Sequence, residues 1–144
     1  MQTFKLIVFH IITPIFFGGL IYISFRDSSL RLFNWFDFIG LHNPIYWIRN
    51  SIHSMKIYIP SWVYFSLPDG LWIYSFTAAT IIYWKNDFQK TKLYLIILFM
   101  IVVLLELLQA FKILSGTFDI LDLISMLLGF LLSKIIIINK LYYR

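Results

Sequence analysis

Long apolar stretches constrain this chain more than any other feature of its sequence. The hydrocarbon core of a bilayer is about 30 Å thick, and a helix needs roughly 20 mostly apolar residues to cross it. Four windows have this character, at residues 4–25, 67–84, 93–111 and 118–138. Of the 144 residues, 60% are hydrophobic and 13% are charged, whereas soluble domains carry about 25% charged residues. The sequence therefore predicts a single all-α domain, a polytopic membrane protein built as a four-transmembrane-helix bundle.

The first window is predicted to be a retained membrane span. Its apolar run is longer than that of a secretory signal peptide, and no cleavage site of the Ala-x-Ala kind follows it. Pro14 permits a kink, while Gly18 and Gly19 permit close approach by a neighbouring helix. We expect His10, in the same window, to bond between helices rather than to bind a ligand.

The connection at residues 26–66 is predicted to form a lid in the headgroup layer. Its two segments, Leu30 to Ile39 and Ile45 to Ile52, are separated by a break at Asn43-Pro44 and mix aromatic with charged residues. Neither segment is long enough to span a membrane, and this composition is typical of interfacial helices that cover the mouth of a bundle. A poorly ordered loop is the alternative.

Charge and cysteine content exclude several functional classes. The net charge of +5 is scattered over the flanks of the apolar windows, which favours membrane lipids over nucleic acid as the partner. The absence of cysteine removes thiolate nucleophiles and Cys-ligated metal sites. Basic residues are densest on one side of the predicted bundle, and this side is expected to be cytoplasmic and to hold both termini. They are Lys5, Lys85, Lys90, Lys92, Lys140 and Arg144.

Ionisable residues inside the apolar windows mark the candidate site. A carboxylate at the centre of a membrane helix costs about 2.5–3.5 kcal/mol, so such a residue is a functional hypothesis by default. Glu106 and Gln109 are three positions apart and share one face of the third window. Asp119 and Asp122 share a face in the first turns of the fourth window, for which Thr117 can supply the cap.

Small and polar residues continue along the fourth window from Asp122 at helical spacing. The stripe consists of Asp122, Ser125, Gly129 and Ser133. In a bilayer such a stripe packs against another helix. We expect its partner to be the polar face of the third window.

The second window begins with Pro68-Asp69, and in the predicted orientation its start meets the other polar residues at the outer surface. The candidate polar pocket consists of Asp69, Glu106, Gln109, Asp119 and Asp122. Possible counterions are Arg26, Arg31, Arg49 and Lys112. Crowded carboxylates share protons or recruit a cation. No His-x-x-x-His or Glu-x-x-His spacing indicates a metal site, and no cofactor is expected.

Each acidic residue also has a purely structural explanation. Asp69 can be a partner of the helix dipole in the first turn of its helix, and Asp119 can be a helix-start residue. Glu106 and Asp122 can serve as hydrogen-bonding groups that hold helices together.

A spaced pattern of polar and small residues runs through positions 68–133. It consists of Glu106-x-x-Gln109, Gly116-Thr117-Phe118-Asp119-x-x-Asp122 and Gly129. This pattern resembles the signature of VanZ-like membrane proteins, small bacterial proteins named for an accessory factor in teicoplanin resistance. The arginine and asparagine of that family are replaced here by Gly116 and Met126, so Lys112 or a lid arginine would have to supply the positive partner. The resemblance implies a place in the bacterial cytoplasmic membrane and supplies no mechanism.

These features lead to two functional hypotheses. The first is an outward-facing acidic pocket that recognises or modifies a polar lipid or glycan-precursor headgroup, with catalysis left open. The alternative is a non-catalytic accessory subunit of a larger membrane protein complex, in which the acids only hold the bundle together. Cation or proton translocation ranks last, because the third window has no polar residue between Lys92 and Glu106 apart from Tyr94.

Overall fold

The computed structural model describes residues 2–114 and 118–142, and all regular structure within these ranges is helical. The first helical column comprises α1 (Gln2–Ile7), the π-helical segment η1 (Val8–Ile12) and α2 (Thr13–Phe25). A group of short helices follows: α3 (Arg31–Phe38), α4 (His42–Ile52), the 3-10 segment η2 (His53–Ile57) and α5 (Ser61–Phe65). The remaining columns are α6 (Leu67–Tyr83), α7 (Phe88–Ala110) and α8 (Ile120–Tyr142).

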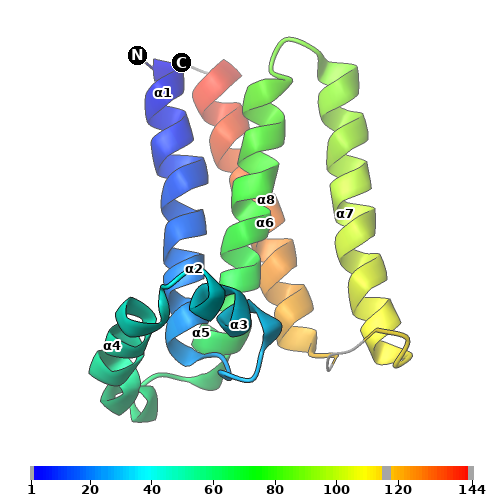
Figure 1. The fold of residues 1–144 in the computed structure, drawn as a ribbon. Helices are drawn as coiled ribbons and strands as arrows, with labels where there is room; N and C mark the ends of the chain where they lie inside the picture. The colour runs from blue at the N-terminus through cyan, green and yellow to red at the C-terminus, as the bar shows by residue number, and fades with distance from the viewer. Residues whose placement is uncertain (1, 115–117, 143–144) are drawn as a thin grey trace.

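The four columns run alternately in opposite directions, so that the start of α1 and the end of α8 lie at the same end of the molecule (Figure 1). Three helical stretches are long and apolar enough to cross a membrane: Thr3–Phe25, Phe88–Ala110 and Ile120–Leu141. α6 runs beside them but has only 17 residues. The all-α prediction is confirmed, together with three helices capable of spanning a bilayer.

The first column contains a π-helical turn immediately before Pro14. Proline has no N–H to donate to the carbonyl four residues earlier, and its ring crowds that carbonyl. The helix widens at Val8–Ile12, and both the N–H and the hydroxyl of Thr13 bond to the Val8 carbonyl, the hydroxyl at 2.8 Å. Single π turns absorb this kind of disturbance within an α-helix. The kink permitted by Pro14 therefore takes the form of a π turn.

α6 forms the centre of the bundle. It packs most extensively against α8 and next against α2, whereas α7 contacts both α6 and α8 sparsely. Figure 1 shows α7 standing apart from the other columns along most of its length. The buried apolar core lies toward the end where α1 begins, and it consists of Leu6, Ala78, Ile81, Ile82, Leu95 and Ile137.

Small residues let α6 and α8 cross at close range. A Cβ atom added to Gly129 would lie 3.0 Å from the carbonyl carbon of Gly70, and one added to Gly70 would lie 2.8 Å from the carbonyl oxygen of Ser125. The part of the α8 stripe formed by Ser125 and Gly129 thus faces α6 rather than α7 as expected. Asp122 at its start lines one cavity with Glu106 and Gln109 of α7. Small residues on both helices allow their backbones to approach, whereas α7 presents bulky side chains such as Leu98 and Phe99.

Two helices extend beyond their apolar windows. α7 begins at Phe88 rather than at residue 93, and α8 runs from Ile120 to Tyr142 rather than from 118 to 138. The apolar windows mark the length that hydrocarbon can cover. Backbone hydrogen bonding continues through the polar residues at their ends, so the helices are longer than the windows.

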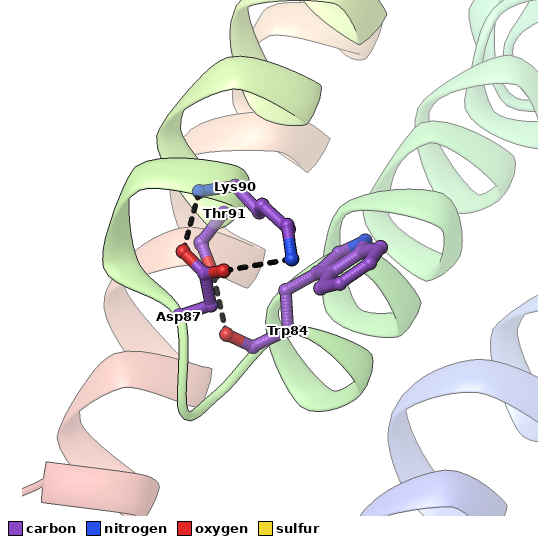
Figure 2. A network of polar contacts seen from close by, with 4 residues as sticks. All are labelled: Trp84, Asp87, Lys90 and Thr91. Carbon is purple, nitrogen blue, oxygen red and sulfur yellow. Dashed lines mark hydrogen bonds and ion pairs between the residues drawn. The ribbon is translucent and has the colours of Figure 1, made fainter.

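A polar network closes the turn between α6 and α7 (Figure 2). The Asp87 carboxylate caps α7, accepting from the Lys90 N–H at 3.0 Å and pairing with the Lys90 ammonium at 3.1 Å. The Thr91 hydroxyl donates to the Trp84 carbonyl at 2.9 Å, and the Lys90 ammonium lies 4.8 Å from the centre of the Trp84 ring. The hydrogen bonds from Lys90 to the Asp87 carboxylate lower the pKa of Asp87 below its ordinary value of 3.8.

The short helices gather at the end of the bundle opposite the start of α1 (Figure 1), and this group, residues 31–65, keeps the name lid. The two predicted lid segments correspond to α3 and α4. The break between them falls at Gly40, whose φ of 77° suits glycine, and not at Asn43-Pro44. α4 begins at His42, so Pro44 lies in its first turn, where a missing N–H costs little.

Arg49 attaches the lid to the first column. Its guanidinium donates to the Ile23 carbonyl at 2.6 Å and lies 4.8 Å from the centre of the Phe33 ring. One side chain of α4 therefore holds both the end of α2 and the buried side of α3.

We predict that Gly129→Ala lowers the free energy of unfolding by about 2 kcal/mol, because its methyl group would meet the backbone of α6. The measurement is equilibrium unfolding in mixed detergent micelles. Gly19→Ala is the matched control, since nothing lies within 4 Å of its added Cβ. This control should leave stability unchanged or raise it by up to about 1 kcal/mol. Equal losses from both substitutions would contradict the close α6–α8 crossing.

We predict that Asp87→Ala lowers the melting temperature at pH 7. The lowered pKa of Asp87 means that its carboxylate stabilises the folded state above pH 3.8, and that this contribution is lost as the pH falls through the folded-state pKa. The difference in melting temperature between the original protein and Asp87→Ala should therefore become smaller below pH 3.8. Asp87→Asn keeps a hydrogen-bond acceptor at the cap, so its melting temperature should fall less than that of Asp87→Ala. A difference that stays constant down to pH 2 would rule out this account.

Candidate functional site

A cavity of about 500 Å³ lies between the end of α2, the start of α6, the second half of α7 and the start of α8. This volume is in the usual range for a site that holds a small ligand or headgroup. Its polar wall is formed by Arg26, Asp69, Glu106, Gln109 and Asp122. Four of the five predicted pocket residues and one of the four predicted counterions therefore line the same cavity.

Two carboxylates on the cavity wall have buried oxygens without partners. Glu106 on α7 is only 5% exposed, and its Oε2 atom makes no hydrogen bond. Asp122 on α8 has a buried Oδ1 atom in the same situation. Gln109 follows Glu106 by three residues and so lines the same side of the cavity. A buried polar oxygen without a partner is costly, so both atoms are positions where a donor from outside the chain would be stabilising.

Arg26 supplies the positive charge of the cavity. It follows the last residue of α2, and its guanidinium donates to the Phe65 carbonyl at 3.1 Å. The same group lies 3.8 Å from a carboxylate oxygen of Asp69, and its carbon is 5.3 Å from the ring centres of both Tyr22 and Phe65. Its Nε atom is buried and unpartnered. Arg26 is therefore held firmly in place while one donor remains available.

An aromatic wall faces the polar groups. The Trp72 ring lies 5.4 Å from the Tyr22 ring, centre to centre, and both residues line the cavity. A Cβ atom added to Gly18 would lie 2.7 Å from the Trp72 indole nitrogen, whereas Gly19 faces open space. The close approach predicted at these two glycines is therefore made at Gly18, by the Trp72 side chain.

Asp119 is not among the residues that line the cavity. It immediately precedes α8, and its Oδ1 atom accepts a hydrogen bond from the Leu121 N–H at 2.9 Å. Asp119 thus occupies the capping position for which Thr117 was predicted, and its structural explanation as a helix-start residue fits the geometry. Thr117 and Gly116 lie outside the described residues.

Three of the predicted counterions lie away from the cavity wall. Arg31 is exposed at the start of α3, and Arg49 is engaged by Ile23 and Phe33 as described above. Lys112 is exposed just past the end of α7 with a φ of 58°. The Lys112 N–H bonds to the Gln109 carbonyl and the Ile113 N–H to the Leu108 carbonyl, which is the Schellman arrangement that terminates many helices.

A second polar cluster joins the first column, α6 and α8, and the partners of His10 in it were not predicted. Lys140 Nζ is 2.8 Å from His10 Nε2, and His10 Nδ1 is 2.7 Å from the Tyr74 hydroxyl. Because an ammonium group only donates, Nε2 accepts and Nδ1 carries the hydrogen that bonds to Tyr74. The prediction that His10 bonds between helices is confirmed. Its partners are 64 and 130 positions away, so no local pattern could have identified them.

The cavity offers acceptors in excess of donors. Ionised carboxylates only accept hydrogen bonds, a guanidinium only donates, and an amide does both. Among the described residues, no group of three or more His, Cys, Asp or Glu side chains is arranged to hold a metal ion. The arrangement is suited to bind groups rich in hydroxyl or amine hydrogens.

We predict that Lys112→Gly raises the free energy of unfolding by about 1 kcal/mol, because glycine adopts a positive φ without the steric penalty paid by other residues. Lys112→Ala serves as the control: it removes the same charge and keeps the Cβ atom, so it should bring no gain. Detergent unfolding of the three proteins measures both effects. If Lys112→Ala raised the free energy of unfolding as much as Lys112→Gly, the effect would come from removal of the charge instead.

No family model matches the chain, and neither a curated protein nor a solved structure matches it at a significant level. The likeness to VanZ-like proteins rests on the spaced residues quoted above. The geometry of the cavity is therefore the foundation for a functional assignment.

Proposed function

We propose that the cavity recognises or modifies a polar headgroup, carried by a membrane lipid or a glycan precursor. The observation that carries this proposal is that three residues lining one cavity each have a buried polar atom without a partner. The atoms are Glu106 Oε2, Asp122 Oδ1 and Arg26 Nε. Leaving such atoms unsatisfied destabilises a fold, and bound ligands commonly satisfy them.

The balance of charge supports a ligand that donates hydrogen bonds. Three carboxylates line the cavity against one guanidinium, so hydroxyl and ammonium groups fit better than a second anion. The Tyr22 and Trp72 rings can add attraction for an ammonium group. Arg26 has one free donor for an acceptor on the ligand, such as a phosphate or glycosidic oxygen.

Roles for the individual residues follow from their positions. Glu106 and Asp122 are the proposed proton-sharing or hydrogen-bonding groups, because both carry a free buried oxygen. Gln109 orients the ligand through its amide. The pair of Arg26 and Asp69 holds the rim where α2 ends and α6 begins.

The proposed setting is the bacterial cytoplasmic membrane, with α6 as a fourth span. Its 17 residues rise about 26 Å, close to the thickness of the hydrocarbon core. Both termini are then cytoplasmic, and the cavity and lid lie at the outer face. Aromatic side chains on the lid, including Trp35, Phe38 and Trp47, are well exposed, which supports a position in the headgroup layer. A VanZ-like identity is part of the same proposal.

The same exposed aromatic residues favour one alternative, an accessory subunit whose lid docks on a larger membrane complex. In that case the cavity carboxylates only hold the bundle together. Amide substitutions in the cavity would then leave function intact, and a partner would copurify from native membranes.

We predict that Glu106→Gln and Asp122→Asn each weaken binding of a donor-rich headgroup about tenfold or more, because each replaces an acceptor oxygen with an amide NH₂ that cannot accept a hydrogen bond. The probes are phosphatidylethanolamine and monoglucosyl diacylglycerol, presented in nanodiscs, with binding measured by native mass spectrometry. Thermal unfolding should show little change in stability for both variants, since each amide has nearly the same shape as the carboxyl group that it replaces and the carboxyl oxygen has no partner to lose.

The matched control is Asp37→Asn, which removes an exposed carboxylate on α3 away from the cavity. It should leave headgroup binding unchanged. Two results contradict the proposal: retained binding by both cavity variants, or a loss of stability that accounts for the loss of binding. The second result would assign the carboxylates to bundle packing.

A further inference from the structure

A second, separate hollow lies between α7 and α8 toward the end of the molecule where α1 begins. It has a volume of about 520 Å³ and shares no lining residue with the polar cavity. Its walls are almost entirely apolar, with Leu95 and Ile96 from α7 and Leu131 from α8. The sparse contact between these helices leaves this space open to the side of the bundle. It is called the α7–α8 crevice below.

Aromatic packing narrows the deep end of the crevice. The Phe99 and Phe130 rings lie 5.6 Å apart, centre to centre, and bridge the two helices. Beyond them lies a smaller apolar cavity of about 120 Å³, which shares both phenylalanines with the crevice. The crevice is therefore an apolar slot that runs from the end of the bundle toward its middle and narrows at these two rings.

Two lysines stand on opposite walls of the crevice. Lys92 comes from the second turn of α7 and Lys134 from α8, and both are exposed. Within the described ranges neither one makes a hydrogen bond or an ion pair, and no carboxylate lines the crevice. The long apolar stem of a lysine can lie along the wall while its ammonium reaches the headgroup region.

An amphiphile with a negative headgroup matches this combination. Hydrocarbon chains fill an apolar slot, and a phosphodiester between two unpaired ammonium groups offsets one of their two positive charges and can accept hydrogen bonds from both. Basic residues beside a gap between membrane helices are a known way to bind anionic lipid headgroups. An apolar protein helix would fill the slot but would leave both ammonium groups without a partner.

We propose that the α7–α8 crevice binds one anionic glycerophospholipid, with its phosphate between Lys92 and Lys134 and an acyl chain along Leu95, Ile96 and Leu131. This site is independent of the polar cavity and of the function proposed for it. The lipid supplies packing that α8 does not give α7, and it comes from the leaflet on the side of the chain termini.

The test compares lipid binding by the delipidated full chain in detergent, measured by native mass spectrometry. Dioleoyl phosphatidylglycerol should bind more tightly than dioleoyl phosphatidylcholine. The double substitution Lys92→Gln with Lys134→Gln should weaken phosphatidylglycerol binding about 30-fold and leave phosphatidylcholine binding unchanged. Bound phosphatidylglycerol should also raise the melting temperature of the original protein more than that of the double variant.

The matched control replaces two exposed lysines away from the crevice, Lys5 and Lys56, with glutamine. Three results overturn the proposal: the crevice variant retains phosphatidylglycerol affinity, the control loses as much affinity as the crevice variant, or the two lipids bind equally. Inorganic phosphate should fail to compete, and effective competition by it would exclude a role for the acyl chain. A dimer that persists after delipidation, with lipid binding insensitive to the lysines, would assign the crevice to a second copy of the chain.

Discussion

The close crossing of α6 and α8 at Gly70 and Gly129 is the constraint on which the rest of the structure depends. These two helices approach so nearly that an added methyl group would meet backbone atoms of the neighbouring helix. The small residues of α8 pack against α6, so α8 has no comparable face of small residues against which α7 could pack closely. Because α7 carries bulky side chains, it stands off from the pair, and the spaces beside it become the polar cavity at one end and the α7–α8 crevice at the other.

The two hollows differ because of where charged residues fall along α7. Near its end, Glu106 and Gln109 face Asp122 of α8 and the Arg26–Asp69 pair across the cavity. Near its start, Lys92 faces Lys134 over apolar walls. The proposed ligands follow from this polarity: a headgroup rich in donors at the acidic end, and an anionic lipid at the basic end. Both would stabilise polar groups that the chain itself leaves without partners.

Local helix geometry explains why much of the site could be predicted. Residues three apart share a helix face, so Glu106 with Gln109 could be grouped from spacing alone, and helix direction brought them to the level of Asp69 and Asp122. The counterions were harder to predict. The three arginines lie in the connection at residues 26–66, and residue spacing does not predict the path of this connection. Arg49 donates a hydrogen bond to a backbone carbonyl of α2. Lys112 adopts the left-handed conformation just past the end of α7.

The sequence by itself determined the helical class, the apolar columns and the polar residues on each helix face, because these depend on hydrophobicity and a period of 3.6 residues. Only the tertiary structure decided which faces meet: Ser125 and Gly129 of α8 pack against α6, and His10 bonds to Tyr74 and Lys140. The physical reason is that lipid is as apolar as leucine, so hydrophobicity cannot select a partner between membrane helices. Selection is left to backbone approach at small residues and to hydrogen bonds between distant positions, which appear only when all the helices are packed together.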